Sequence, residues 1–133
     1  MSIYNSCLPK NKHDFESLDK LKNLDKERII PLLPELIVWV QDMNWPISEE
    51  VAKILLMYQI EIIPLIKDIL RTNDNVWKYW CLETLVKRLD EESKELLKND
   101  LARLSERPTA GERLEQLDVT ATEILKTYTK LSS

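Results

Sequence analysis

The residues best suited to catalysis or metal binding are few and lie near the N-terminus. His13 is the only histidine, Cys7 precedes it by six residues, and Asp14 follows it directly. These residues are too few for a zinc site, which usually takes four converging ligands. A nucleophile with His13 as its base is also not indicated, because no motif typical of such enzymes accompanies His13. Because Gly111 is the only glycine, the chain also lacks the P-loop, the GxGxxG motif and the GxSxG elbow. We therefore predict no catalytic residue, no metal and no cofactor.

Carboxylates are plentiful, and one pair has a suggestive spacing. Glu35 and Asp42 are seven residues apart, so one helix could present both on the same side. Glycoside hydrolysis needs two acids across a cleft, one of them desolvated. The chain has 23 acidic residues, so chance pairs are expected and solvated acids are the simpler interpretation. Asp42 itself is expected to cap the next helix or to accept hydrogen bonds from backbone amides in its turn.

Aromatic residues give the strongest indication of a binding surface. They gather in two stretches and comprise Trp39, Trp45, Trp77, Tyr79 and Trp80. Tryptophan is enriched at binding hot spots because it combines a large apolar area with one N–H donor. Residues 77–80 are consecutive and spread around a helix, so they cannot all face one core. Helices that pack on two sides would bury Trp39 and Trp80. For Trp45 and Trp77, the sequence favours neither a core position nor a surface position.

Lys78 lies among these rings and has three possible environments. It could stack on a ring as a cation, pair with a turn acid such as Asp42, or remain exposed. The candidate binding site combines the turn and the aromatic helix, and it comprises Asp42, Asn44, Trp45, Trp77, Lys78 and Trp80.

Helices must position these residues, because apolar side chains recur every three or four positions. Asp14, Asp25 and either Asn73 or Asp74 can cap helices, the last running to Leu89. A further helix is expected over residues 91–106. Thr109 and Glu112 have the spacing of a capping box. The apolar stripe of the helix that follows comprises Leu114, Leu117, Ala121, Ile124, Leu125, Tyr128 and Leu131. No strand is predicted.

A short motif recurs along the chain. Ile29-Ile30-Pro31-Leu32-Leu33 returns as Ile62-Ile63-Pro64-Leu65-Ile66, an offset of 62 − 29 = 33 residues. A period of this length is typical of helical solenoids, in which stacked hairpins share a core. The second copy resembles a HEAT repeat, with Pro64 in its first helix, Asp74 in its turn, and Val76 and Lys78 opening its second helix. Trp77 interrupts that pattern, and the first copy departs further with two prolines and Asn44-Trp45-Pro46.

Over nearly its whole length, the chain resembles a bacterial family, domain of unknown function 5071. The stretches that carry the resemblance are LPKNKHDFESLDKL, LLPELIVWVQDMNWP and VWKYW. The resemblance implies an α-helical, HEAT-like fold and a bacterial origin. It brings no activity and no catalytic residues.

Composition narrows the class of protein. The net charge of −4 argues against a nucleic-acid binder, which usually has a basic footprint. Cys7 and Cys81 have no CxxC spacing, and the opening residues do not read as a signal peptide, so we expect a cytoplasmic protein. The apolar run from Ile29 to Val40 carries Glu35 and is shorter than the roughly twenty residues of a membrane span.

Together these observations predict an all-α, right-handed, HEAT/ARM-like stack of helical hairpins with about seven helices. Residues 1–133 would form one domain, with repeats at about 29–59 and 62–89 and capping helices at both ends. The favoured function is a non-enzymatic module that binds another protein, such as an immunity or adaptor protein. The alternative is a small helical enzyme, or a nucleic-acid or small-ligand binder with an aromatic pocket. A closed aromatic pocket with a desolvated acid would favour that alternative.

Overall fold

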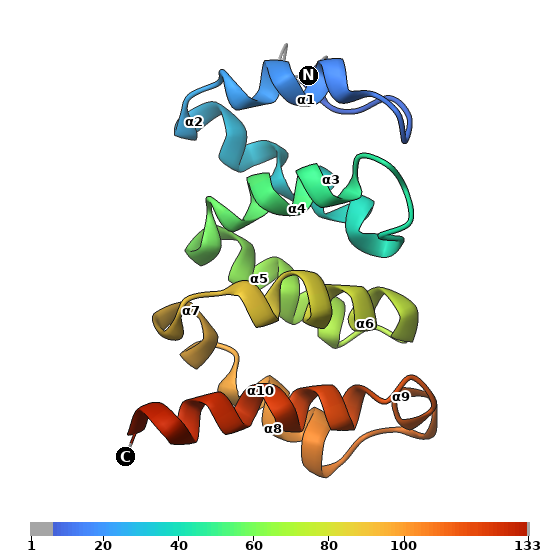
Figure 1. Ribbon diagram of the computed structural model, residues 1–133, viewed down its shortest axis with the longest axis vertical. Helices are drawn as coiled ribbons and strands as arrows, with labels where there is room; N and C mark the ends of the chain where they lie inside the picture. Colours follow the sequence, from blue (N-terminus) through green and yellow to red (C-terminus); the bar gives the residue numbers. More distant parts are fainter. Residues whose placement is uncertain (1–6, 133) are drawn as a thin grey trace.

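The computed structural model describes the backbone of residues 7–132 and the side chains of residues 7–127. Within these ranges all regular secondary structure is helical, as predicted, and there is no strand. The helices follow one another along the long axis of the molecule, from α1 (Phe15–Lys22) at one end to α10 (Leu117–Ser132) at the other (Figure 1). The expected number of about seven helices is wrong, because several of the expected helices are divided into shorter pieces.

The first divided segment is the proline-rich stretch that contains the first copy of the recurring motif. Pro31 and Pro34 each lie in the first turn of a new helical piece. Proline offers no N–H for a helical hydrogen bond, and its ring displaces the carbonyl four residues before it, so a single continuous helix cannot form. The resulting pieces alternate between α and 3-10 geometry and are α2 (Lys26–Ile29), η2 (Ile30–Leu32), α3 (Leu33–Leu36) and η3 (Ile37–Gln41).

The middle of the stack consists of three longer helices, α4 (Ser48–Leu56), α5 (Gln59–Leu70) and α6 (Asn75–Thr84). α5 packs against both of its neighbours, and α6 also packs against η3. Pro64 lies inside α5 without ending it. The Asp74 carboxylate accepts a hydrogen bond from the Trp77 amide at 3.0 Å and caps α6. Asp14 and Asp25 cap α1 and α2 in the same way, so these three predicted caps are confirmed.

The C-terminal third is more divided than the hydrophobic pattern predicts. The helix expected over residues 91–106 breaks at Leu96 and Leu97. A second break lies at Gln116, whose φ is 56°. The pieces are η4 (Val86–Arg88), α7 (Glu91–Glu95), α8 (Lys98–Glu106) and α9 (Ala110–Leu114), followed by α10.

The break at Gln116 changes the predicted apolar stripe. Leu114 is 84% exposed, whereas Leu117, Ala121 and Ile124 are buried against the neighbouring helices. Leu114 therefore does not belong to the stripe, because its helix ends before α10 begins. Leu125 is half-buried, and the side chains of Tyr128 and Leu131 lie outside the described residues.

Leucine and isoleucine side chains from successive helices form one continuous core. Ile62, Ile66 and Leu70 of α5 are fully buried, and Leu82 of α6 lies in the same core. Gly111 permits a close approach of α9 to the Asn75 side chain, because a Cβ atom there would lie 2.5 Å from Asn75 Nδ2. α9 can therefore start directly against the start of α6. No helix within residues 7–132 is both long and apolar enough to cross a membrane.

Candidate functional site

The predicted binding turn, residues 42–46, is held together by its own hydrogen bonds. Asp42 Oδ1 accepts a bond from the Asn44 amide at 2.8 Å. The hydroxyl of buried Ser48 lies 2.7 Å from the Trp39 carbonyl oxygen and 2.9 Å from that of Asp42. Asp42 therefore bonds a backbone amide, one of its two expected roles. It does not cap α4, whose N-cap is Ile47.

The aromatic residues form two edge-to-face pairs. The ring centroids of Trp39 and Trp45 are 5.4 Å apart, and those of Tyr79 and Trp80 are 5.0 Å apart. Trp39, Trp77 and Trp80 are half-buried and pack against the core, while Trp45 is half-buried and rests on Trp39. None of these four tryptophans is fully exposed, and the Trp77 Nε1 atom is buried without a hydrogen-bond partner among the described residues.

Lys78 differs from every sequence-based expectation. Its side chain is 4% exposed, and Nζ lies 2.9 Å from Oε2 of Glu112, which is 1% exposed. Arg103 from α8 binds the same carboxylate with both guanidinium branches, at 3.0 and 2.7 Å. Lys78 therefore forms an internal ion pair. The prediction that it belongs to an exposed binding surface is wrong. The partner of its ammonium group is Glu112, and neither Asp42 nor the face of an aromatic ring takes that place.

The electrostatics of this cluster hold Glu112 in its charged form. The hydrogen bonds from Arg103 lower the pKa of Glu112 from 4.5 to about 2, against the opposing effect of burial. Lys78 and the Thr109 amide contribute further in the same direction. In turn, Glu112 raises the pKa of the Arg103 guanidinium. A general acid needs the reverse shift, toward a raised carboxyl pKa, so this buried acid is unsuited to proton transfer near neutral pH.

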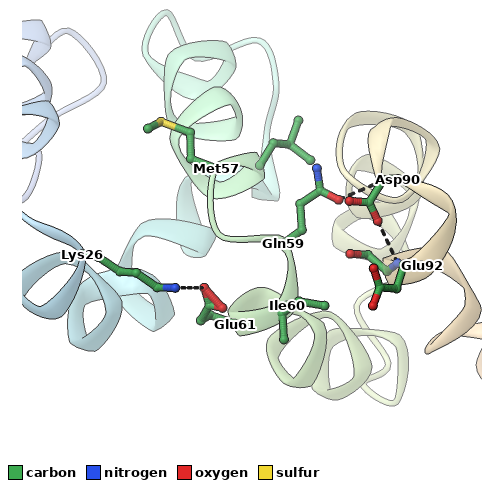
Figure 2. A pocket seen from close by; sticks show the side chains of 9 residues that line it. Lys26, Met57, Gln59, Ile60, Glu61, Asp90 and Glu92 are labelled. Atoms are coloured by element: carbon green, nitrogen blue, oxygen red, sulfur yellow. Dashed lines mark hydrogen bonds and ion pairs between the residues drawn. The ribbon is translucent and has the colours of Figure 1, made fainter.

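A second surface, which the sequence did not reveal, lies beside the turn between α4 and α5. There a pocket of about 300 Å³ opens among α2, the α4–α5 turn and α7. We call it the acidic pocket. Its principal lining residues are Lys26, Met57, Gln59, Ile60, Glu61, Asp90 and Glu92 (Figure 2).

Apolar side chains at the mouth of the acidic pocket remain open to solvent. Met57 is 70% exposed and Ile60 is 53% exposed, although the other apolar side chains of α4 and α5 are mostly buried in the core. Met57 falls off the stripe of Val51, Ile54, Leu55 and Tyr58 that faces the core. An apolar residue off the helical stripe was the one sequence signal that could have indicated this pocket.

The polar side of the acidic pocket is partly organised by hydrogen bonds (Figure 2). The Gln59 side-chain oxygen accepts a bond from the Asp90 amide at 2.9 Å, and the Asp90 carboxylate caps α7 through the Ser93 amide at 2.8 Å. Lys26 Nζ lies 3.8 Å from Glu61. Three carboxylates thus face one ammonium group, and the pocket is suited to attract positive charge.

The described residues offer no arrangement for metal chemistry. Among residues 7–127, no group of three or more His, Cys, Asp or Glu side chains is placed to hold a metal ion. Burial raises the pKa of the Cys81 thiol to about 12, so this cysteine is a poor nucleophile at neutral pH.

Comparisons with known proteins identify one family. No curated protein matches the chain. The sequence model of a family described as a domain of unknown function (DUF5071) matches residues 7–125, nearly the whole of the 133-residue chain. The three stretches that first indicated the resemblance fall within or at the start of this range, and the chain belongs to the DUF5071 family.

Proposed function

We propose that this DUF5071 member is a non-enzymatic protein-binding module and that the acidic pocket is its docking surface. The observation that carries the proposal is the exposure of Met57 and Ile60 beside three carboxylates. Exposed apolar side chains rimmed by polar groups are typical of interaction sites. The fold that presents them is, in this proposal, a right-handed HEAT-like stack, whose surfaces usually receive extended partners.

The charge of the pocket selects the chemistry of the partner. Glu61, Asp90 and Glu92 face one ammonium, from Lys26, and the chain as a whole carries −4. A partner segment that inserts an apolar side chain between Met57 and Ile60 and places lysine or arginine beside the carboxylates would complement both properties. We therefore commit to a basic amphipathic segment of another protein as the occupant.

The aromatic surface is less suited to this role than the sequence suggested. Lys78 is buried and paired with Glu112, away from the aromatic surface, and Trp77 and Trp80 pack against the core. Asn44 is exposed and Trp45 is half-buried, and neither residue lines the acidic pocket. The alternative of an enzyme with an aromatic pocket loses support, because the buried acid Glu112 has a lowered pKa and no tryptophan lines the acidic pocket.

A peptide titration followed by NMR tests the proposal. The probe is a synthetic helix of leucine and lysine, and its counterpart replaces each lysine with glutamate. We expect the basic peptide to shift amide signals of residues 56–61 and 90–93, and the acidic peptide to leave them unchanged. Ile60→Ser should weaken binding, whereas Leu114→Ser should not, since Leu114 is 84% exposed but lies outside the pocket.

Two results would overturn this proposal. Equal responses to both peptides would show that apolar exposure alone attracts them. Concentration-dependent dimerisation that Ile60→Ser abolishes, measured by light scattering, would show that the occupant is a second copy of the chain.

A further inference from the structure

A second cavity lies where the end of α5 meets α6, α8 and α9, and its lining is basic. It has a volume of about 230 Å³, enough for a group larger than a single water molecule. We call it the cationic cavity. The side chains that matter here are those of Arg71, Asn73, Lys78, Arg103 and Glu112.

The Glu112 carboxylate in this cavity cannot accept any further hydrogen bond. Oε1 accepts bonds from Arg103 Nη1 at 3.0 Å and from the Thr109 amide at 2.8 Å. Oε2 accepts bonds from Lys78 Nζ at 2.9 Å and from Arg103 Nη2 at 2.7 Å. A carboxylate offers about four lone-pair positions, and all of them are occupied.

Lys78 is left with donors that the protein does not use. Its ammonium carries three N–H groups, yet among the described side chains and backbone its only acceptor is Glu112. The side chain is 4% exposed, so bulk water has little access to it. Because buried charged donors are costly to leave unpaired, the remaining N–H groups favour an acceptor inside the cavity that Lys78 lines, either water or an anion.

The net charge of the cavity has the opposite sign to that of the chain. Arg71, Lys78 and Arg103 contribute three positive charges, while Glu112 and Asp100 contribute two negative charges, Asp100 lying 3.5 Å from Arg71. One positive charge remains, within a chain of net charge −4. Arg71 is 65% exposed at its side chain and Asn73 is exposed, so both can reach a ligand that enters from solvent.

We propose that the cationic cavity binds a phosphate-type oxyanion, either free or as the terminal group of a small metabolite. Lys78 supplies the buried ammonium, and Arg71 and Asn73 supply donors at the entrance. Glu112 holds Lys78 and Arg103 in place and does not contact the ligand. This site is separate from the acidic pocket and does not depend on the protein-binding role.

Calorimetric titration with inorganic phosphate at constant ionic strength tests the site. We expect measurable binding to the wild-type protein and about tenfold weaker binding to Arg71→Gln, the loss typical of one hydrogen bond to a charged group. Lys78→Met should abolish binding. Lys53→Gln removes an exposed lysine elsewhere and should bind phosphate like the wild type.

Further titrations separate the sources of the ligand and guard against unfolded variants. Tighter binding of glycerol phosphate than of inorganic phosphate would assign the site to a metabolite, and equal binding would assign it to the free ion. Circular dichroism checks that each variant is folded, and Arg71→Gln still provides a test should Lys78→Met unfold. The proposal is overturned if phosphate has no more effect than chloride at equal ionic strength, if succinate binds as tightly as phosphate, or if folded Arg71→Gln binds like the wild type.

Discussion

The acidic pocket and the cationic cavity differ in where their charges lie. In the acidic pocket, the side chain of Lys26 is 67% exposed and that of Glu61 is 23% exposed. In the cationic cavity, Lys78 and Glu112 are 4% and 1% exposed. Exposed ion pairs contribute little to stability, usually about 0–1 kcal/mol, whereas breaking a buried pair strands a charge away from water. The charges of Lys26 and Glu61 are thus available to a partner, while the Lys78–Glu112 pair stabilises the folded state.

The strongest test of this contrast is Glu112→Gln. The substitution leaves Lys78 and Arg103 without their shared counter-charge, and we expect it to lower the free energy of unfolding by about 3–5 kcal/mol. Urea denaturation followed by circular dichroism measures the change. The matched control is Glu92→Gln in the acidic pocket, which should alter stability by less than about 0.5 kcal/mol. Similar losses from both substitutions would remove the distinction between the two sites.

Acid should affect the two regions unequally. The pKa of Glu112 is about 2 in the folded protein against an ordinary value of 4.5, so the unfolded state binds the proton more readily. Its contribution to stability is therefore present above pH 4.5 and is lost as the pH falls toward 2. Denaturant midpoints measured across this range should fall more steeply for the wild type than for Glu112→Gln. Parallel curves would show that Glu112 is not the responsible carboxyl group.

The glycine contact beside the cationic cavity offers a smaller effect. Gly111→Ala would place a methyl group 2.5 Å from Asn75 Nδ2, which opposes the usual gain in helix propensity. In an Asn75→Ala background the obstruction disappears, and the same substitution should become stabilising. We expect a coupling energy of about 1 kcal/mol between the two positions, obtained from the unfolding of the single and double variants. Additive changes would mean that the Asn75 side chain moves aside without cost.

The smallest expected change in stability comes from the acidic pocket itself. Met57→Ser combined with Ile60→Ser removes two exposed apolar side chains, and the melting temperature should change by no more than about 2 °C. Differential scanning calorimetry is sufficient to measure this. A large loss would show that these side chains stabilise the fold, which would weaken the case for a docking surface.

The features that the sequence predicted correctly are local ones. Asp74 caps α6 three residues before the amide it binds, and Thr109 and Glu112 form the expected capping box. Such contacts depend on a few neighbouring residues, which a single sequence displays directly. The pairing of Lys78 with Glu112 joins residues 34 positions apart, and no spacing rule indicates it.

The incorrect predictions arose where packing overrides a periodic pattern. Leu114 keeps helical spacing with Leu117, yet the chain turns at Gln116 and leaves Leu114 in solvent. The acidic pocket was missed because its carboxylates come from α5 and from the start of α7, some thirty residues later along the chain. Of the predicted binding residues, Asp42 and Asn44 lie in the turn as described, whereas Lys78 lies in the interior and not on the predicted surface.

The proline-divided segment from α2 to η3 also affects how the molecule opens. Its 3-10 pieces have poorer hydrogen-bond geometry than an α-helix, and Pro31 and Pro34 contribute no N–H groups. In α5, by contrast, the single proline Pro64 lies within a helix that continues past it. Deuterium should consequently enter the amides of residues 30–41 earlier than those of α5. The end of the stack that contains α1 would then separate from the middle layers before the rest unfolds, so the protein would lose its layers in sequence from that end.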